Sequence, residues 1–268
     1  MPRSGSTLMQ NILGNHPEIY ATPTSPVSEY LLNLRHTYTK SQVVKALDSE
    51  QMKGAFLTFC RYGLQGYFDS LTDKEYVIDK SRSWLVNKNY LSAFYPNPKV
   101  ICMVRDLRDI IASMEKNYRK HPDKFVFLDR CDSKLGIEPY TLPERVTKWL
   151  GKDGKPVGAT ISYLQEAISL GNHKNVLFIR FEDLCLHPKL VMQRIHEYLE
   201  IDYFEYDFNN IRQVTHEDDK FHGIFGDHTI KNKIEPVISN HKEILGETIS
   251  EEIFERNKWY FELFKYEK

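Results

Sequence analysis

The residues at the start of the chain combine a basic side chain, hydroxyl groups and a glycine at the entrance to a helix. Small residues let backbone N–H groups approach a ligand closely, and the helix that follows directs its positive end to the same place. The pattern predicts a cradle for an anion such as a phosphate; the alternative is an ordinary Ser/Thr helix N-cap. The cradle would consist of Arg3, Ser4, Gly5, Ser6, Thr7 and Leu8.

Two further basic residues follow short apolar segments that are predicted to be strands. Lys80 follows Tyr76–Asp79, and Arg105 follows Lys99–Val104, a continuous apolar run typical of a buried parallel strand. Ser113 lies in the helix that begins beside Arg105 and could reach the same anion. Because ligands bind at the carboxyl ends of parallel strands, we expect these groups and the opening loop to converge on one anion site.

The segments that position these residues alternate between short strands and helices. A third strand is predicted at Val176–Arg180, whereas Tyr20–Pro26 is interpreted as a loop because two prolines interrupt it. The alternation predicts an α/β fold, with a three-layer, P-loop-like parallel sheet flanked by helices. We expect a single domain over residues 1–268, with a lid-like helical and loop insertion at about residues 117–158. The alternative for the insertion is a solvated excursion without function.

Composition limits the classes of partner and the compartment. The 36 basic and 37 acidic residues nearly cancel, so no global field favours nucleic acid or an anionic membrane. The four cysteines are widely spaced and form no C-x-x-C pair, which argues against a metal knuckle or a disulfide framework. No signal peptide precedes the first motif, and no apolar run approaches the ~18 residues of a spanning helix. These features predict a cytoplasmic protein.

Taken together, four blocks of sequence resemble the sulfotransferases that use 3′-phosphoadenosine-5′-phosphosulfate (PAPS). The Arg-Ser-Gly form of the first block is more similar to the protein-tyrosine and bacterial branch than to the cytosolic small-molecule branch. The resemblance implies transfer of a sulfuryl group from PAPS to a hydroxyl or amine acceptor, with 3′,5′-adenosine bisphosphate as product. The blocks are Pro2–Leu8, Asp79-Lys80-Ser81, Val104–Asp109 with Ser113, and Arg180–Leu184 with His187-Pro188.

The resemblance also implies roles for the basic residues. The opening loop would hold the 5′-phosphosulfate, and Arg105 with Ser113 would hold the 3′-phosphate. Cations aimed at the bridging oxygen stabilise the charge that develops there, and Arg3 and Lys80 are the candidates. Asp79 is expected to pair with Lys80 or to cap a helix. No metal is expected, because backbone amides and cations already bind the leaving group.

Two blocks depart from the family pattern near the nucleotide. Phe181 stands where a tyrosine is usual, so it could stack or pack but not donate a hydroxyl. Gly223–Asp227 resembles the late loop that closes over the nucleotide, yet Phe221-His222 replaces the basic pair that usually precedes it. Lys220 or Lys231 is the expected source of that charge.

The acceptor must lose a proton, so a base is expected near the sulfuryl group. The family positions for this base hold Arg82 and Thr24, and neither can serve. Glu29, at the start of the next helix, is the predicted replacement; the alternative is a solvated helix glutamate. His36 and His228 are further candidates.

Two other classes share parts of this pattern. A Mg-dependent nucleotide or small-molecule kinase would share the sheet and loop, but it requires a Gly-Lys-Ser/Thr element that is absent after Gly5. A non-catalytic nucleotide-binding module would explain the loops without a base. The expected partners are the nucleotide and an acceptor left open among a peptide tyrosine, a sugar hydroxyl, a lipid and a small phenol; the oligomeric state is also open.

The opening loop carries one structural anomaly. A loop of this kind normally follows a buried strand, yet only Met1 and Pro2 precede Arg3. Either the sequence starts late or the sheet lacks its usual central strand. If a gap lies beside Lys99–Val104, we expect the loop to be held chiefly by its helix.

Overall fold

The computed structural model describes residues 1–47, 49–120, 141–151, 156–222 and 227–268. Its strands form two parallel pairs: β1 (Ile19–Thr24) with β2 (Tyr76–Lys80), and β3 (Val100–Val104) with β4 (Val176–Arg180). The predicted α/β class with parallel strands is therefore confirmed. Among the described residues the two pairs are not hydrogen-bonded to each other, so the gap beside Val100–Val104 that the sequence left open is present.

A cavity separates the two pairs of strands. Its volume is about 1370 Å³, and every residue of β2 and of β3 lines it. The opening loop lies at this gap and leads into α1 (Ser6–Gly14), whose side chains at Ile12 and Leu13 are buried. The loop is thus anchored by its helix, as the sequence anomaly predicts.

The strand β1 was interpreted as a loop from its prolines, and that interpretation is wrong for most of its length. β1 pairs only with β2 among the described strands, so it is an edge strand, where a proline removes no ladder hydrogen bond on the open side. The register between the two strands shifts between Ala21 and Thr24, the part of β1 that contains Pro23. The irregularity accommodates the proline.

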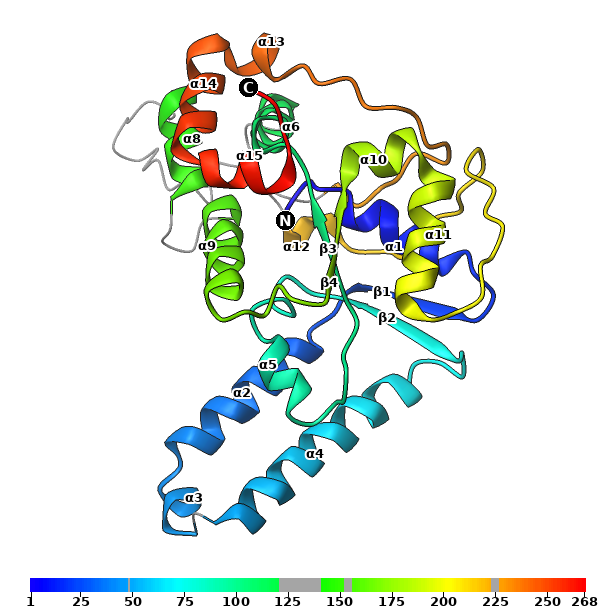
Figure 1. Cartoon of the computed structure of the whole chain (residues 1–268), viewed down its shortest axis with the longest axis vertical. Helices are drawn as coiled ribbons and strands as arrows, with labels where there is room; N and C mark the ends of the chain where they lie inside the picture. The colour runs from blue at the N-terminus through cyan, green and yellow to red at the C-terminus, as the bar shows by residue number, and fades with distance from the viewer. Residues whose placement is uncertain (48, 121–140, 152–155, 223–226) are drawn as a thin grey trace.

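Helices flank β3 and β4 on both faces (Figure 1). Successive side chains of a strand point to opposite faces, so Val104 packs into one hydrophobic cluster with Phe261, and Met103 into another with Met192. The helices, besides α1, are α2 (Val27–Lys40), α3 (Gln42–Ala46), α4 (Glu50–Asp69), α5 (Lys88–Ser92), α6 (Leu107–Lys120), α8 (Leu142–Leu150), α9 (Pro156–Ser169), α10 (Phe181–Leu186), α11 (Pro188–Leu199), α12 (Asp219–His222), α13 (His241–Leu245), α14 (Glu247–Arg256) and α15 (Lys258–Phe264).

The pair α2 and α4 extends away from the rest of the chain, with the short α3 at its tip (Figure 1). A third cluster of apolar side chains, including Leu31 of α2 and Leu64 of α4, joins the two helices near α5. The segment between α2 and β2 thus contains two helices, α3 and α4.

The described part of the predicted insertion is packed rather than loose. α8 buries Val146 and Trp149 in the cluster that contains α6. Its Arg145 forms a buried ion pair with Glu115 of α6, with an N–O distance of 2.7 Å. Residues 121–140 and 152–155 lie outside the described residues, and the lid role of the insertion stays a prediction.

Candidate functional site

The opening loop bends at Gly5, whose φ of 81° suits glycine rather than residues with a side chain. α1 begins directly after it without a side-chain cap, and the Ser4 hydroxyl instead donates to the carbonyl of Met1 at 2.6 Å. The first N–H groups of α1 have no intrahelical acceptor by helix geometry. Since Gly5, Ser6, Thr7 and Leu8 line the cavity, this end of α1 faces the cavity without a hydroxyl cap, as an anion cradle requires.

Arg3 of this loop lies together with three other predicted ligands, Ser113, Arg105 and Phe181. Arg3 donates from Nε to Ser113 Oγ at 3.1 Å, and Arg105 donates from Nη1 to the Arg3 carbonyl at 3.0 Å. The Arg105 guanidinium lies over the Phe181 ring, 4.8 Å from its centroid. Its Nε is buried and has no hydrogen-bond partner among the described residues. A buried donor in this state is costly, so Arg105 is suited to an anionic ligand.

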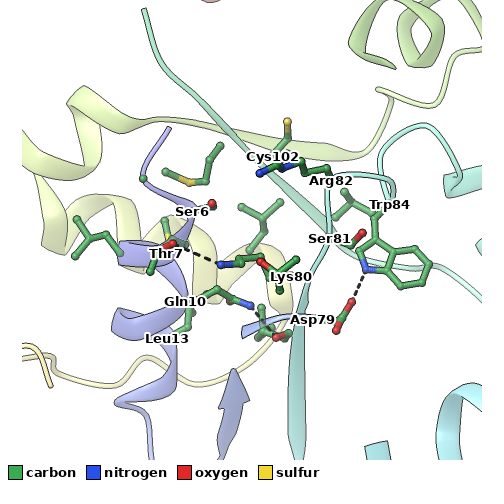
Figure 2. A pocket seen from close by; sticks show the side chains of 18 of the residues that line it. Ser6, Thr7, Gln10, Leu13, Asp79, Lys80, Ser81, Arg82, Trp84 and Cys102 are labelled. Carbon is green, nitrogen blue, oxygen red and sulfur yellow. Dashed lines mark hydrogen bonds between the residues drawn. The ribbon is translucent and has the colours of Figure 1, made fainter. Parts of the chain in front are cut away.

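Lys80 reaches the same loop from the end of β2 (Figure 2). Its Nζ lies 3.5 Å from Thr7 Oγ1 and 2.5 Å from Glu217 Oε1. Arg82, two residues further on, also lines the cavity. The carboxyl end of β2 and the entrance of α1 therefore direct cations and hydroxyls to one place.

Partial burial shapes the electrostatics of these cations. Burial lowers the pKa of Lys80, partly opposed by Glu217, and burial also lowers the pKa of Arg3, partly opposed by Asp227. Arg3 donates from Nη1 to the Asp227 carbonyl oxygen at 3.3 Å, and its Nη2 lies 4.0 Å from the Asp227 carboxylate. Cations that are partly buried and close together stabilise a bound polyanion strongly.

Several predicted residues lie elsewhere or have different partners. Glu29 is exposed in the first turn of α2 and does not line the cavity. Lys231 lines the cavity, but its side chain is 84% exposed and lies 3.8 Å from Glu235. Asp79 accepts hydrogen bonds from Thr22 and from the Trp84 indole instead of pairing with Lys80, because Lys80 pairs with Glu217. The late loop lies outside the described residues at positions 223–226.

Sequence reasoning missed one acidic residue of the site and assigned no partner to a histidine. Glu217 pairs with Lys80, and His228 lies between Glu217 and Asp219. The only local signal is the polar run from His216 to Asp219 in an irregular stretch, and nothing in its spacing connects it to Lys80. Within the described ranges no group of three His, Cys, Asp or Glu residues could hold a metal ion.

A loop-to-helix junction beside parallel strands is typical of the class of proteins that bind a phosphorylated nucleotide. The sequence matches the sulfotransferase family over residues 1–205, and the chain belongs to that family. It is 27% identical over 207 residues to protein-tyrosine sulfotransferase A of Caenorhabditis elegans, covering 75% of this chain and 48% of that protein. Protein-tyrosine sulfotransferase 2 of Gallus gallus is also 27% identical over 207 residues, covering 75% and 49%.

The chain thus spans about half the length of the curated relatives it matches. The predicted likeness to the protein-tyrosine branch is confirmed. The sulfotransferase domain of the Synechococcus PCC 7002 olefin synthase is 17% identical with a TM-score of 0.44, covering 93% of this chain and 91% of that domain. Likeness at this level does not decide the family.

The prediction of a cytoplasmic location is wrong, because it is contradicted by the likeness to protein-tyrosine sulfotransferases. Among the described helices, none has the length and apolar character needed to cross a membrane.

Proposed function

We propose that this protein transfers the sulfuryl group of PAPS to an acceptor hydroxyl, without a metal ion. The observation that carries the proposal is the convergence of three cations, Arg3, Lys80 and Arg105, on the loop that opens α1. The 5′-phosphosulfate would lie on the N–H groups of Gly5 to Leu8, and the 3′-phosphate on Arg105 with Ser113. The buried, unpartnered Arg105 Nε supports a phosphate there.

The residues of the loop supply the electrostatic part of the reaction. As the S–O bond to the bridging oxygen breaks, negative charge grows on the departing phosphate. Lys80 and Arg3 lie where they can neutralise that charge, which stabilises the transition state more than the bound substrate. Phe181, packed against Arg105 and Gly5, would hold the arginine and the loop in place for the nucleotide. Lys231 would add charge from the cavity rim.

A tyrosine side chain of a protein is the acceptor that the relatives favour, because both are named protein-tyrosine sulfotransferases. The family model matches residues 1–205, the part of this chain that contains the opening loop and Lys80. The cavity of about 1370 Å³ exceeds the ~300–1,000 Å³ typical of small-ligand sites, so it can hold a nucleotide together with an acceptor side chain. The kinase alternative has no support from the relatives.

Calorimetry and a transfer assay test this function. In EDTA, we expect 3′,5′-adenosine bisphosphate and PAPS to bind, and ATP with Mg²⁺ to bind more weakly. With sulfur-labelled PAPS, we expect label on an acidic peptide that contains tyrosine and none on the same peptide with phenylalanine instead. Preference for ATP with Mg²⁺ would contradict the proposal. Nucleotide binding without transfer to any peptide, sugar, lipid or phenol would favour the non-catalytic module.

A further inference from the structure

The Glu217 carboxylate is held at the end of β2 by contacts on both of its oxygens. Oε1 accepts hydrogen bonds from Lys80 Nζ at 2.5 Å and from the Thr24 backbone N–H at 3.0 Å. Oε2 lies 3.4 Å from His228 Nε2. The Glu217 side chain is only 4% exposed, so these contacts replace most of its solvent.

Glu217 lies one contact behind the wall of the cavity. It does not itself line the cavity, but Thr24, Lys80 and His228 all do. If Lys80 turned toward the bridging oxygen of a bound phosphosulfate, it would leave Oε1 and uncover that oxygen to the cavity. A carboxylate oxygen would then lie next to the place where Lys80 meets the sulfuryl group.

The backbone before Glu217 is fixed to the helix that carries the anion loop. Asn11 Oδ1 accepts hydrogen bonds from the backbone N–H groups of Val214 and Thr215, at 2.6 and 3.0 Å. Asn11 Nδ2 donates to Thr215 Oγ1 at 3.0 Å. Because Asn11 belongs to α1, Glu217 and the opening loop are positioned by the same buried helix.

The contacts of Glu217 keep its carboxyl group ionised. Burial raises the pKa of this group, but the hydrogen bonds from Lys80 and Thr24 lower it further, so the pKa lies below the ordinary value of 4.5. Loss of the Lys80 contact would leave burial to raise the pKa again, so the carboxylate becomes a stronger base when Lys80 turns to the nucleotide.

We propose that Glu217 is the general base of the sulfuryl transfer. The inference rests on the function proposed above. The acceptor oxygen forms a bond to sulfur while its O–H proton moves to Glu217 Oε1. The S–O bond to the 5′-phosphate breaks, and its electron pair leaves with 3′,5′-adenosine bisphosphate, next to Lys80. Atoms and charge balance without any further reactant.

Three rival roles give different outcomes. Glu217 could only cover Lys80, in which case removing its charge frees the lysine and leaves turnover intact. His228, which lines the cavity and lies 2.6 Å from Asp219, could itself be the base. Glu29 could be the base if the acceptor binds over α2. The test therefore compares Glu217→Gln with His228→Asn and Glu29→Gln.

The experiment measures turnover of labelled PAPS with the tyrosine peptide, and calorimetric affinity for 3′,5′-adenosine bisphosphate, on the same preparations. For Glu217→Gln we expect turnover to fall about 10²–10⁴-fold, the usual share of a general base, with nucleotide affinity equal or higher. Glu217→Asp should recover part of the loss. Glu205→Gln, which removes the carboxylate of the exposed Lys189–Glu205 pair, is the matched control and should keep wild-type turnover.

Nucleotide affinity also shows that each variant retains a folded site. Turnover within a few-fold of wild type in Glu217→Gln, or a loss confined to His228→Asn or Glu29→Gln, would overturn the assignment while leaving the proposed function in place. A wild-type protein that binds the nucleotide but transfers no label would instead overturn the proposed function, and this inference with it.

Discussion

The Phe181 ring lies directly over Gly5: a Cβ atom added at Gly5 would stand 2.2 Å from Cδ2 of that ring. Gly5 also has a φ of 81°, which residues with a Cβ rarely adopt. Two independent constraints therefore require glycine at the turn into α1. The contact joins Phe181, the residue that follows β4, to the opening loop, so the Phe181 ring and the loop form one unit.

Gly5→Ala is expected to weaken binding of 3′,5′-adenosine bisphosphate at least tenfold, because either the loop or the Phe181 ring must move. Calorimetry measures the change. Phe181→Ala on the Gly5→Ala background removes the ring clash but not the backbone strain, so it should recover part of the affinity. Gly54→Ala, where an added Cβ meets nothing within 4 Å, is the control and should bind normally. Unchanged affinity in Gly5→Ala would remove the loop from the nucleotide site.

Arg105→Ala should weaken binding of the same nucleotide by about 1.5–3 kcal/mol, the range for a lost hydrogen bond to a charged group. Binding of adenosine 5′-phosphate, which lacks the 3′-phosphate, should be weakened much less by the same substitution. The comparison of the two nucleotides by calorimetry reports whether Arg105 contacts the 3′-phosphate. Equal losses for both would move Arg105 to the 5′ side of the site.

Lys80 should make nucleotide binding sensitive to alkaline pH. Because burial lowers its pKa below the ordinary 10.5, the free protein loses this charge at a lower pH than an exposed lysine does. Affinity for 3′,5′-adenosine bisphosphate should therefore be full below the Lys80 pKa and begin to fall before pH 10.5. Calorimetry across that range measures the pH at which the affinity begins to fall.

Lys80→Arg should remove this fall in nucleotide affinity at alkaline pH, since arginine stays charged throughout the range. Lys189→Arg, at an exposed ion pair, should leave it unchanged. A fall that persists in Lys80→Arg would assign the pH effect to another group.

The parts of the site that the sequence could predict are those encoded by neighbours in the chain. The opening loop can be predicted because Gly5 and its hydroxyl neighbours precede an apolar helix. Lys80 and Arg105 can be predicted because each follows a strand, and ligands bind at the carboxyl ends of parallel strands. The structure brings all of these together. Their roles toward the nucleotide remain predictions.

Glu217 could not be predicted in this way because tertiary packing alone brings it to Lys80. It lies in an irregular segment, 137 residues after its partner, and is held there by Asn11. Its carboxylate accepts a hydrogen bond from the backbone N–H of Thr24, the residue at one of the family positions for the base. β1 was missed for a related reason: Pro23 argues against a central strand, and only the pairing with β2 reveals an edge strand.

The buried pair between Arg145 and Glu115 predicts how firmly α8 is joined to the rest of the fold. Arg145 donates from Nε and Nη2 to the two Glu115 oxygens at 3.0 and 2.7 Å, and the side chains are only 9% and 1% exposed. Arg145→Met leaves the carboxylate buried, so it should lower the free energy of unfolding in urea by about 3 kcal/mol.

The Arg119 side chain is 52% exposed and also binds the Glu115 carboxylate. Arg119→Met should lower the free energy of unfolding by less than about 1 kcal/mol. Glu115→Leu combined with Arg145→Met should recover much of the loss, because neither charge is then left buried alone. If α8 instead moves as part of a lid, Arg145→Met will leave the free energy of unfolding near wild type.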